Sequence, residues 1–434
     1  MKFQSIIIFA ISCITLVSCK NEDTKSTQTS IPGSIDQYMT ALTKLKQFNG
    51  VLLIEDSLGN AFSKAYNIED GNVPSLPVTV EHQFDLRSIA KLLAKASLIK
   101  LEHEGKIHFD QKLSEFFPDF PRGDEITIDQ LMHHKSGLGR ELSNYEGPNA
   151  QLSPNEIIEL IHQEKLEFEP GQDSRYSNLG FQLLYKIVGD LSGGTYADYL
   201  RNNFFDPLGM DNSGSHYLDP KARLDNYAYG HFLYDMDSVQ KVGKDDSDMQ
   251  QGHTFSTVND MKKFLDFIGS NKIYEELIED DAISHAGGSK GKRAWVYSDQ
   301  KKNYKIIFLA NYDNIPFSNL TKDLRDMMEG KEVEIPVEVK RQAVEVAASI
   351  LKNYTGTYDF VDAGHILISI KFEDGGLNAY QKGELAGALI PENDSTFFWD
   401  AKSKESFIFT TDEEGNQKAL MDFQGVRWDG VLIK

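Results

Sequence analysis

The chain has 434 residues, a length at which two or three domains are more usual than one. Hydrophobic residues make up 40% of it, which is enough for a sizeable core. The formal net charge of -21 argues against nucleic acid as a partner, because binding to phosphates needs a basic patch.

Residues 1–19 are predicted to be a signal peptide outside the fold. An apolar run at residues 6–17 is too short to span a bilayer comfortably, and it ends in Leu-Val-Ser before Cys19. This ending resembles a bacterial lipobox, which implies cleavage before Cys19 and lipidation of that cysteine. A plain secretory signal followed by a chance cysteine is the alternative. Since the other cysteine, Cys13, lies in the removed segment, the mature chain is expected to have no disulfide and no thiolate metal site.

A polar tether is predicted at residues 20–33, which are rich in serine and threonine and are expected to be disordered. Together with the lipobox, it predicts an exported protein that is lipid-anchored through Cys19 to a bacterial outer membrane. The sequence does not decide between the periplasmic face and the cell surface.

Residues 34–330 are predicted to form the main domain, in which strands near both ends flank a long helical stretch. Strands are expected at residues 48–55, 61–68, 281–285, 293–298 and 304–311. Helices are expected at residues 35–48, 89–104, 128–134, 154–163, 179–191, 196–205, 257–269 and 318–328. This order predicts an α+β fold with an antiparallel sheet, flanking helices and an inserted helical region.

Residues 331–350 are predicted to be a charged linker, and residues 351–434 contain one short strand-like run after another. Strands are expected at residues 356–360, 366–372, 377–381, 385–390, 396–399, 406–411 and 420–428. Evenly spaced short strands predict a small antiparallel barrel or sandwich.

Ser88 and Lys91 stand three residues apart at the start of a predicted helix. Residues at this spacing share one helix face, so the hydroxyl and the amine would be neighbours. A lysine that burial or nearby positive charge keeps neutral can take the proton of a serine and make it a nucleophile. The pattern is weak by itself. It recurs in this chain with serines at Ser97, Ser238, Ser289, Ser298 and Ser349.

Two later segments carry groups that could complete such a site. Tyr176 could act as a phenolate or pass a proton to a leaving group, and Asn178 could hold a substrate amide and the lysine. Gly287 and Gly288 would let a substrate backbone approach closely. The backbone N–H of Gly288 could pair with that of Ser88 as an oxyanion hole.

The segment at residues 131–138 contains two adjacent histidines, His133 and His134. Adjacent side chains point to different faces of any regular element, so the two rings are not expected to act together. Packing and capping is the preferred interpretation of this segment.

Six segments follow one another in a set order along the chain. They are Ser88-x-x-Lys91, residues 131–138, Tyr176-Ser-Asn178, residues 207–210, residues 255–257 and His285-Ala-Gly287. In this order they resemble the serine β-lactamase-related family, which includes class C β-lactamases, D-alanyl-D-alanine carboxypeptidases, D-aminopeptidases and family VIII esterases. The resemblance covers about residues 35–328 and implies a β-lactamase/transpeptidase-like fold. The start of the tail, residues 354–358, resembles the lipocalin-like barrel often appended to these enzymes.

The resemblance implies a role for each residue of the site. Ser88 would attack a carbonyl and form an acyl-enzyme, Lys91 would take its proton, and Tyr176 would act as partner base and protonate the leaving group. Asn178 would bind the substrate amide, and the N–H groups of Ser88 and Gly288 would hold the oxyanion. No metal or organic cofactor is expected, since the nucleophile and the base are both side chains.

Two residues depart from the family pattern. His285 occupies the third motif, where many members have lysine, and it is a weaker fixed cation at neutral pH. Ala286 replaces a hydroxyl residue that helps β-lactamases and carboxypeptidases to bind the substrate carboxylate. Both departures argue against a strong β-lactamase and favour an esterase or an amidase/peptidase.

The predicted function is therefore a serine hydrolase outside the cytoplasm that acts on an ester, an amide or a D-amino-acid peptide. Its substrate would be a small molecule, a peptide or a cell-wall fragment. A penicillin-binding-like sensor or binding protein without turnover is the alternative on the same fold. The oligomeric state is not predicted.

Overall fold

The computed structural model describes residues 31–145, 152–215, 224–234, 238–243, 253–361, 365–401, 403–412, 414–423 and 426–433. The predicted signal peptide, Cys19 and most of the tether lie outside these ranges. Helix α1 (Ile31–Lys44) includes residues 31–33, which the sequence assigns to the tether, and begins earlier than the helix expected at 35–48. Within the described ranges, no helix combines the length and the apolar character needed to cross a bilayer.

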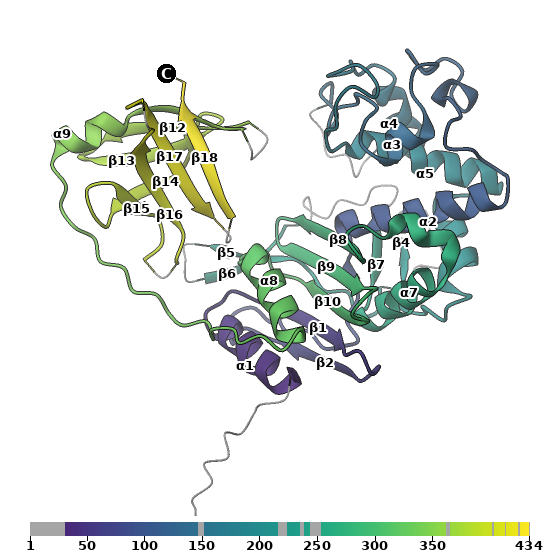
Figure 1. Cartoon of the computed structure of the whole chain (residues 1–434), viewed down its shortest axis with the longest axis horizontal. Coiled ribbons are helices and arrows are strands. Elements are labelled where there is room, and N and C mark those ends of the chain that lie inside the picture. The colour runs from purple at the N-terminus through teal and green to yellow at the C-terminus, as the bar shows by residue number, and fades with distance from the viewer. Residues whose placement is uncertain are drawn as a thin grey trace, which may run out of the picture.

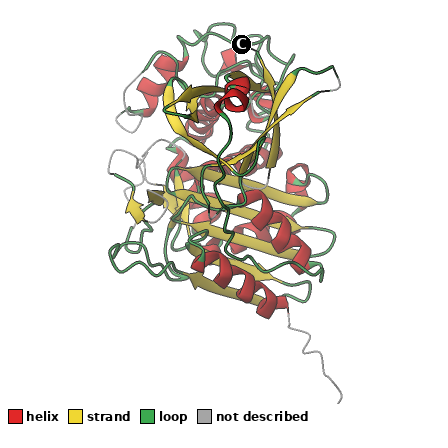
Figure 2. Ribbon diagram, turned by 90° about the vertical axis from the view of Figure 1, so that its left-hand side faces the viewer, coloured by secondary structure: helices red, strands yellow, loops and turns green. Residues whose placement is uncertain are grey.

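The central sheet joins strands from both ends of the main domain, which confirms the predicted fold class. Its order is β2 (Ala61–Tyr66), β1 (Gly50–Glu55), β10 (Tyr304–Ala310), β9 (Lys292–Asp299) and β8 (Ala282–Ser289). Every neighbouring pair is antiparallel. Strand β1 pairs with β10 from Gly50 opposite Ala310 to Glu55 opposite Lys305, so the first hairpin and the returning strands form one sheet (Figure 2).

Helices cover both faces of this sheet because its central strands are apolar on both sides. Along β1, Val51 and Leu53 belong to the hydrophobic core shared with α2 (Ala90–His103) and α7 (Val258–Ser270). The alternate residues Leu52 and Ile54 belong to a second core with α1 and α8 (Phe317–Met328). Successive side chains of a strand point to opposite faces, so the sheet separates the two cores.

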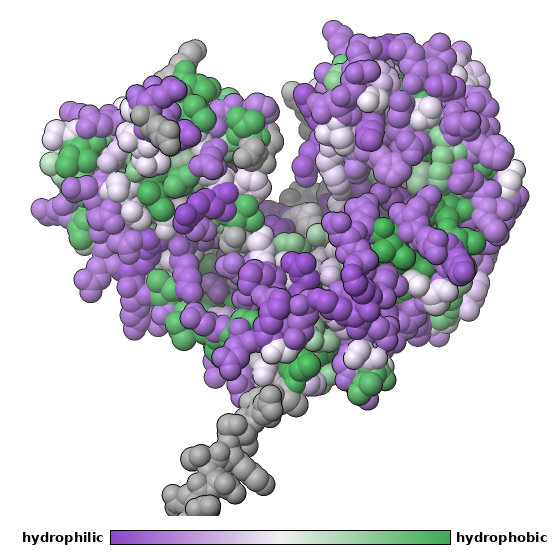
Figure 3. Space-filling view, viewed as in Figure 1, coloured by the Kyte–Doolittle hydropathy of each residue, from purple (hydrophilic) through white to green (hydrophobic). Residues whose placement is uncertain are grey.

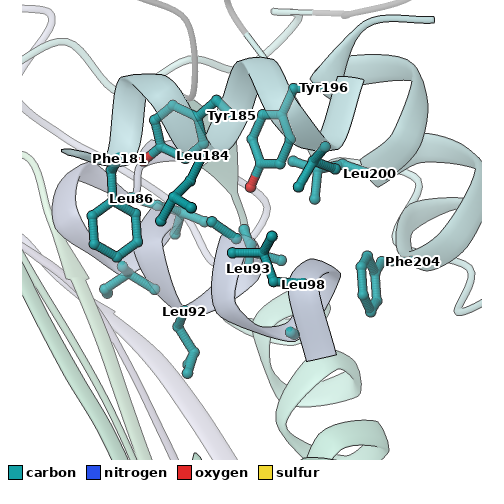
Figure 4. Packing of buried hydrophobic residues seen from close by; sticks show 14 of the residues in the cluster. Leu86, Leu92, Leu93, Leu98, Phe181, Leu184, Tyr185, Tyr196, Leu200 and Phe204 are labelled. Atoms are coloured by element: carbon teal, nitrogen blue, oxygen red, sulfur yellow. The ribbon is translucent and has the colours of Figure 1, made fainter. Parts of the chain in front are cut away.

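The inserted region contains most of the remaining helices. They are α3 (Ile128–Met132), α4 (Pro154–Ile161), α5 (Asn178–Ser192) and α6 (Tyr196–Leu200). Figure 1 shows α3, α4 and α5 above α2. Helix α2 is buried on nearly every side, as expected for a helix inside a domain. In Figure 4, Leu93 and Leu98 of α2 lie against side chains from α5 and α6. This packing fixes the helix whose start carries Ser88.

Several short elements are absent from the sequence-based description. The helix expected at 196–205 is α6 followed by a π-helical segment, Arg201–Phe205. Five short strands form two further small sheets. One sheet contains β3 (Phe84–Asp85), β7 (Thr254–Ser256) and β4 (Gly214–Ser215), and the other contains β5 (His231–Tyr234) and β6 (Ser238–Lys241). Segments this short have no measurable periodicity. Strand β3 matters for the site, because its pairing with β7 holds the chain just before Ser88.

The C-terminal part is a closed barrel of eight strands, so the barrel rather than the sandwich is confirmed. After α9 (Ala348–Leu351) come β11 (Gly356–Phe360), β12 (Ile366–Glu373), β13 (Gly376–Gln381), β14 (Glu384–Pro391), β15 (Thr396–Phe398), β16 (Ser406–Thr411), β17 (Gln417–Phe423) and β18 (Val426–Leu432). The single strand expected at 420–428 is therefore two strands, β17 and β18.

Aromatic side chains fill the inside of the barrel. Tyr358, Phe360, Phe397, Phe407 and Phe409 are each no more than 3% exposed and belong to one core cluster. The barrel interior is thus a packed core rather than an open ligand cavity. In the space-filling view, the barrel and the helical region rise on either side of a notch (Figure 3).

Candidate active site

Ser88 lies where the chain passes from β3 into α2. Residues Arg87–Ile89 form a 3₁₀ turn, and the α-helix begins at Ala90, so Lys91 lies in its first turn. Arg87 has a φ of 50°, a left-handed conformation that is unfavourable for a residue with a Cβ atom. This backbone turn presents Ser88 ahead of the helix while keeping it within one turn of Lys91.

Tyr176 and Asn178 reach the same place from the start of α5. Ser177, between them, caps this helix by accepting the N–H of Gly180, and its own hydroxyl donates to the Gly139 carbonyl at 2.9 Å. The Tyr176 hydroxyl donates to Ser88 Oγ at 2.7 Å. Lys91 Nζ donates to Asn178 Oδ1, also at 2.7 Å. The structure therefore brings the four predicted residues into two hydrogen-bonded pairs.

Burial sets the protonation of the lysine and the tyrosine. It lowers the pKa of Lys91 to about 7, helped by the nearby cations Arg87 and Arg140 and opposed by Glu141. Lys91 Nζ also lies 4.8 Å from the centre of the Tyr176 ring. Burial raises the pKa of Tyr176, so the phenol keeps its proton at neutral pH. Lys91 is thus the group of this pair that can accept a proton near pH 7.

His134 packs against the site, which confirms the packing interpretation for this histidine. Its ring centre lies 4.6 Å from that of Tyr176, and its Nδ1 accepts the N–H of Ser177 at 3.1 Å. Burial and the nearby Lys91 lower the pKa of His134 to about 4, so the ring is neutral. His133 points elsewhere and pairs with Asp129 at 2.9 Å.

The third motif lies on β8, beside the turn that carries Ser88. A Cβ atom on Gly287 would stand 2.4 Å from the Leu86 carbonyl oxygen and 3.0 Å from Ser88 N, so only glycine allows this approach. Gly288 is the next residue along the strand and pairs with Arg293 of β9. The predicted oxyanion-hole residues therefore belong to two segments in direct contact.

His285 carries no fixed charge in this arrangement. Its Nδ1 donates to the Ala286 carbonyl at 2.9 Å, which leaves Nε2 as an acceptor. Burial lowers the pKa of His285 to about 4. The strand therefore offers neither a cation at 285 nor a hydroxyl at 286 to a substrate carboxylate.

Two charged residues of the site are missing from the sequence-based prediction. Arg140 lies with its guanidinium carbon 5.3 Å from the centre of the Tyr176 ring. Glu141 accepts a hydrogen bond from Asn178 Nδ2. Both are exposed residues of a loop, and only their position just after the 131–138 segment could have indicated them.

A buried ion pair lies next to the nucleophile and was also missed. Lys292 Nζ of β9 donates to Asp85 Oδ2 of β3 at 2.7 Å, and the two side chains are 6% and 2% exposed. Lys292 also donates to the Tyr227 hydroxyl at 3.0 Å, and the Arg87 guanidinium lies 3.9 Å from Asp85. These contacts tie the chain before Ser88 to the strand that neighbours β8.

The surroundings of the site contain no evident metal position. In the part of the chain that the structure describes, no three His, Cys, Asp or Glu side chains are placed to share a metal ion. A cleft of about 890 Å³ lies between α1, α8, the linker and the barrel, and none of the site residues described above except Arg293 lines it.

Comparison with known proteins gives one family and a consistent fold. A family model described as Beta-lactamase matches residues 59–280. A curated penicillin-binding protein of Bacillus subtilis (strain 168) is 24% identical over 443 residues, which cover 89% of this chain and 96% of that protein.

Two solved structures share the fold at low identity. The D-amino acid amidase from Ochrobactrum anthropi SV3, complexed with L-phenylalanine amide, has a TM-score of 0.60 at 19% identity, covering 69% of this chain and 99% of that one. The octameric penicillin-binding protein homologue from Pyrococcus abyssi has a TM-score of 0.59 at 20% identity, covering 92% of this chain and 99% of that one.

Proposed function

Because this chain belongs to the β-lactamase family, whose model matches residues 59–280, we propose that it is a serine hydrolase with an acyl-enzyme on Ser88. The observation that carries the proposal is the hydrogen bond from Tyr176 to Ser88 Oγ beside a lysine whose pKa is about 7. A serine hydroxyl needs a nearby base that is unprotonated at the working pH, and Lys91 meets that condition.

In the acylation step, Ser88 Oγ attacks the substrate carbonyl carbon and its proton passes to neutral Lys91. The carbonyl oxygen gains negative charge, which the N–H groups of Ser88 and Gly288 stabilise. Tyr176 then gives its phenolic proton to the leaving oxygen or nitrogen as the bond to carbon breaks. The Lys91 ammonium returns a proton to Tyr176, so both groups regain their starting state.

Deacylation repeats these steps with water as the nucleophile. Water attacks the acyl carbon, one of its protons passes to Lys91, and the bond from carbon to Ser88 Oγ breaks. Tyr176 donates to Ser88 Oγ along the hydrogen bond already present in the free enzyme. The acid product leaves, and Lys91 reprotonates Tyr176.

The substrate we propose is an ester, an amide or a D-amino-acid peptide, with weak β-lactam hydrolysis at most. A neutral His285 next to Ala286 supports this choice, because neither residue supplies a fixed charge or a hydroxyl for a substrate carboxylate. The same observation is the argument for a binding protein without turnover as the second candidate.

Labelling with a fluorophosphonate probe tests the proposal. The folded protein is expected to react, and Ser88→Ala is expected to abolish labelling. Ser97→Ala is a matched control, because Ser97 begins another Ser-x-x-Lys pattern but is buried in α2 and donates to the Leu93 carbonyl. Absence of labelling in the folded protein, or labelling that persists in Ser88→Ala, would refute the mechanism.

Turnover separates the two candidate functions. A panel of nitrocefin, p-nitrophenyl esters and D-alanyl-D-alanine peptides is expected to give product release that depends on Ser88. Saturable binding of a cell-wall fragment with no product release from any substrate would instead identify a sensor.

Export and lipid anchoring form a separate proposal, based on Cys19 and the apolar run before it. In a bacterial host, labelled palmitate is expected to enter the protein and to be lost in Cys19→Ala. Cys13→Ala is the matched control and is expected to keep the label. Equal labelling of the protein with and without Cys19 would rule out this anchor.

A further inference from the structure

A buried ion pair joins the two segments that carry the proposed oxyanion-hole donors. Asp85 lies three residues before Ser88, and Lys292 lies four residues after Gly288 in the hairpin of β8 and β9. Lys292 Nζ donates to Asp85 Oδ2 at 2.7 Å, and both side chains are buried. The contact therefore links the segment of one donor to the segment of the other.

Tyr227 closes this contact into a triangle. Its hydroxyl accepts a hydrogen bond from Lys292 at 3.0 Å and donates one to Asp85 Oδ2 at 3.3 Å. Burial and the charge of Asp85 raise the pKa of Tyr227, so the phenol keeps its proton and can donate. A buried charge pair needs such additional hydrogen bonds, because its members have lost their water. The three side chains therefore hold one another in one arrangement.

The hairpin that carries Lys292 is held from its other side. Gly291, in the turn between β8 and β9, has a φ of 75°, and its N–H donates to Asp313 Oδ2 at 2.7 Å. Because this turn is fixed, the Lys292 side chain can fix the position of Asp85, and with it the chain that leads to Ser88.

The backbone turn before Ser88 needs a contact of this kind. Arg87 has a φ of 50°, and such a strained conformation persists only where the surrounding structure holds it. The Arg87 guanidinium lies 3.9 Å from Asp85, so one carboxylate faces both Arg87 and Lys292. Gly287 of β8 lies against the same turn but has no side chain to hold it. The Asp85 carboxylate thus connects the strained turn to the sheet.

We propose that Asp85 and Lys292 act as a clamp that positions the two N–H donors of the oxyanion hole. This inference rests on the proposed function and adds two positioning residues to it. An oxyanion hole stabilises the transition state only when its donors lie at hydrogen-bond distance from the developing negative charge. A shift of about 1 Å in such a group can slow a reaction by about a hundredfold, so a clamp on both segments directly affects acylation.

Two esters that differ in one atom test the clamp. With p-nitrophenyl acetate the negative charge develops on oxygen, whereas with its thiono analogue, which has C=S in place of C=O, it develops on sulfur. Sulfur is larger and a weaker hydrogen-bond acceptor, so donors placed for oxygen favour the oxygen ester.

Release of p-nitrophenol from the full-length protein measures acylation with either ester. The bond from carbon to the nitrophenyl oxygen breaks after the bond to Ser88 Oγ forms, so the release is observed even where the acyl-enzyme is not hydrolysed. The quantity compared is the ratio of the second-order acylation rate constants for the oxygen and the thiono ester, each divided by its rate of spontaneous hydrolysis.

The wild type is expected to favour the oxygen ester, and loss of the clamp is expected to lower the ratio by about ten- to a hundredfold. The main variant combines Asp85→Asn with Lys292→Met, because it leaves neither member of the pair as an unpaired buried charge. Lys292→Arg keeps the charge and is expected to retain part of the ratio. Tyr227→Phe removes only the bridging hydroxyl and is expected to cause a smaller loss.

Lys305→Met is the matched control for loss of an ion-paired lysine of the sheet. Lys305 is partly buried and pairs with Glu55 at 2.7 Å. It lies opposite Ser298 of β9, roughly 20 Å along that strand from Lys292. The control should destabilise the protein and leave the ratio unaltered, because a smaller folded fraction slows acylation by both esters equally.

The ratio distinguishes positioning of the donors from a general effect on stability. An unaltered ratio in the folded double variant overturns the inference, as does a wild type without preference for the oxygen ester. If the double variant does not fold, Tyr227→Phe decides by the same criterion. In each case labelling of Ser88 by the fluorophosphonate leaves the proposed function intact, whereas absence of labelling removes that function first.

Discussion

The burial of Lys91 is expected to lower the free energy of unfolding of the protein. The pKa of this lysine falls from its ordinary value of 10.5 to about 7, mainly because the charged form loses water. A tenfold change in proton affinity is worth about 1.4 kcal/mol, so protonated Lys91 destabilises the fold by about 5 kcal/mol at pH 6. Replacement by the uncharged Lys91→Met is therefore expected to stabilise the folded protein while it abolishes activity.

The sign and the pH window of this effect follow from linkage. The pKa in the folded state is lower than in the unfolded chain, so between about pH 7 and 10.5 the unfolded chain binds more protons and the stability of the wild type rises with pH. The advantage of Lys91→Met should therefore shrink by about 2 to 3 kcal/mol from pH 6 to pH 9. Lys91→Met also loses the hydrogen bond to Asn178, which changes the free energy of unfolding by the same amount at every pH.

Urea unfolding followed by circular dichroism at pH 6, 7, 8 and 9 measures this difference. Lys44→Met, at the exposed last residue of α1, is the control for removal of a lysine charge. If the difference between Lys91→Met and the wild type is the same at every pH, Lys91 is not held near neutrality and cannot be the base.

Three further predictions concern the residues around Ser88. Arg87→Gln removes a cation that lowers the pKa of Lys91, so the midpoint of the pH dependence of fluorophosphonate labelling should move upward from about pH 7; a downward shift would contradict this. Asp85→Asn leaves the buried Lys292 without its carboxylate and should destabilise the protein by about 3 to 5 kcal/mol in urea unfolding; a change below about 1 kcal/mol would show that the pair is unimportant for stability. Gly287→Ala places a methyl group 2.4 Å from the Leu86 carbonyl and should slow labelling by about a hundredfold or more, as for loss of one oxyanion donor; near-normal labelling would show that β8 can move away freely.

The fold could be predicted largely because its signals are local. The continuous apolar run of β10 and the alternation along the barrel strands each follow from a few neighbouring residues. The error at residues 420–428 has the same origin, since the sequence between Phe423 and Val426 is Gln-Gly, which has no proline and is not one of the strong hairpin dipeptides that would divide the predicted strand. Strand β3, with two residues, is too short for any periodic signal and is formed by its pairing with β7.

Some residues of the candidate site could not be predicted from neighbouring residues in the sequence. Ser88 and Lys91 could be named because their spacing suits one turn of helix, and Tyr176 and Asn178 because the order of the six segments resembles the β-lactamase-related family. Lys292, by contrast, contacts Asp85 across 207 positions of the sequence, and only the folded sheet brings them together. In the sequence, Glu141 looks like an ordinary residue of a surface loop. Only its hydrogen bond with Asn178 in the folded structure identifies it as part of the site.

Glu141 accepts a hydrogen bond from Asn178 and is expected to affect the protonation of Lys91. Its negative charge raises the pKa of Lys91, against the lowering caused by burial. Glu141→Gln should therefore lower that pKa further, so a larger fraction of Lys91 is neutral below pH 7 and labelling by an uncharged fluorophosphonate becomes faster there. Labelling rates measured from pH 5 to pH 8, with Glu384→Gln at an exposed site on β14 of the barrel as control, test this effect. A midpoint that stays in place or moves upward would mean that the charge of Glu141 does not raise the pKa of Lys91, and the arrangement of base, amide and carboxylate would need another explanation.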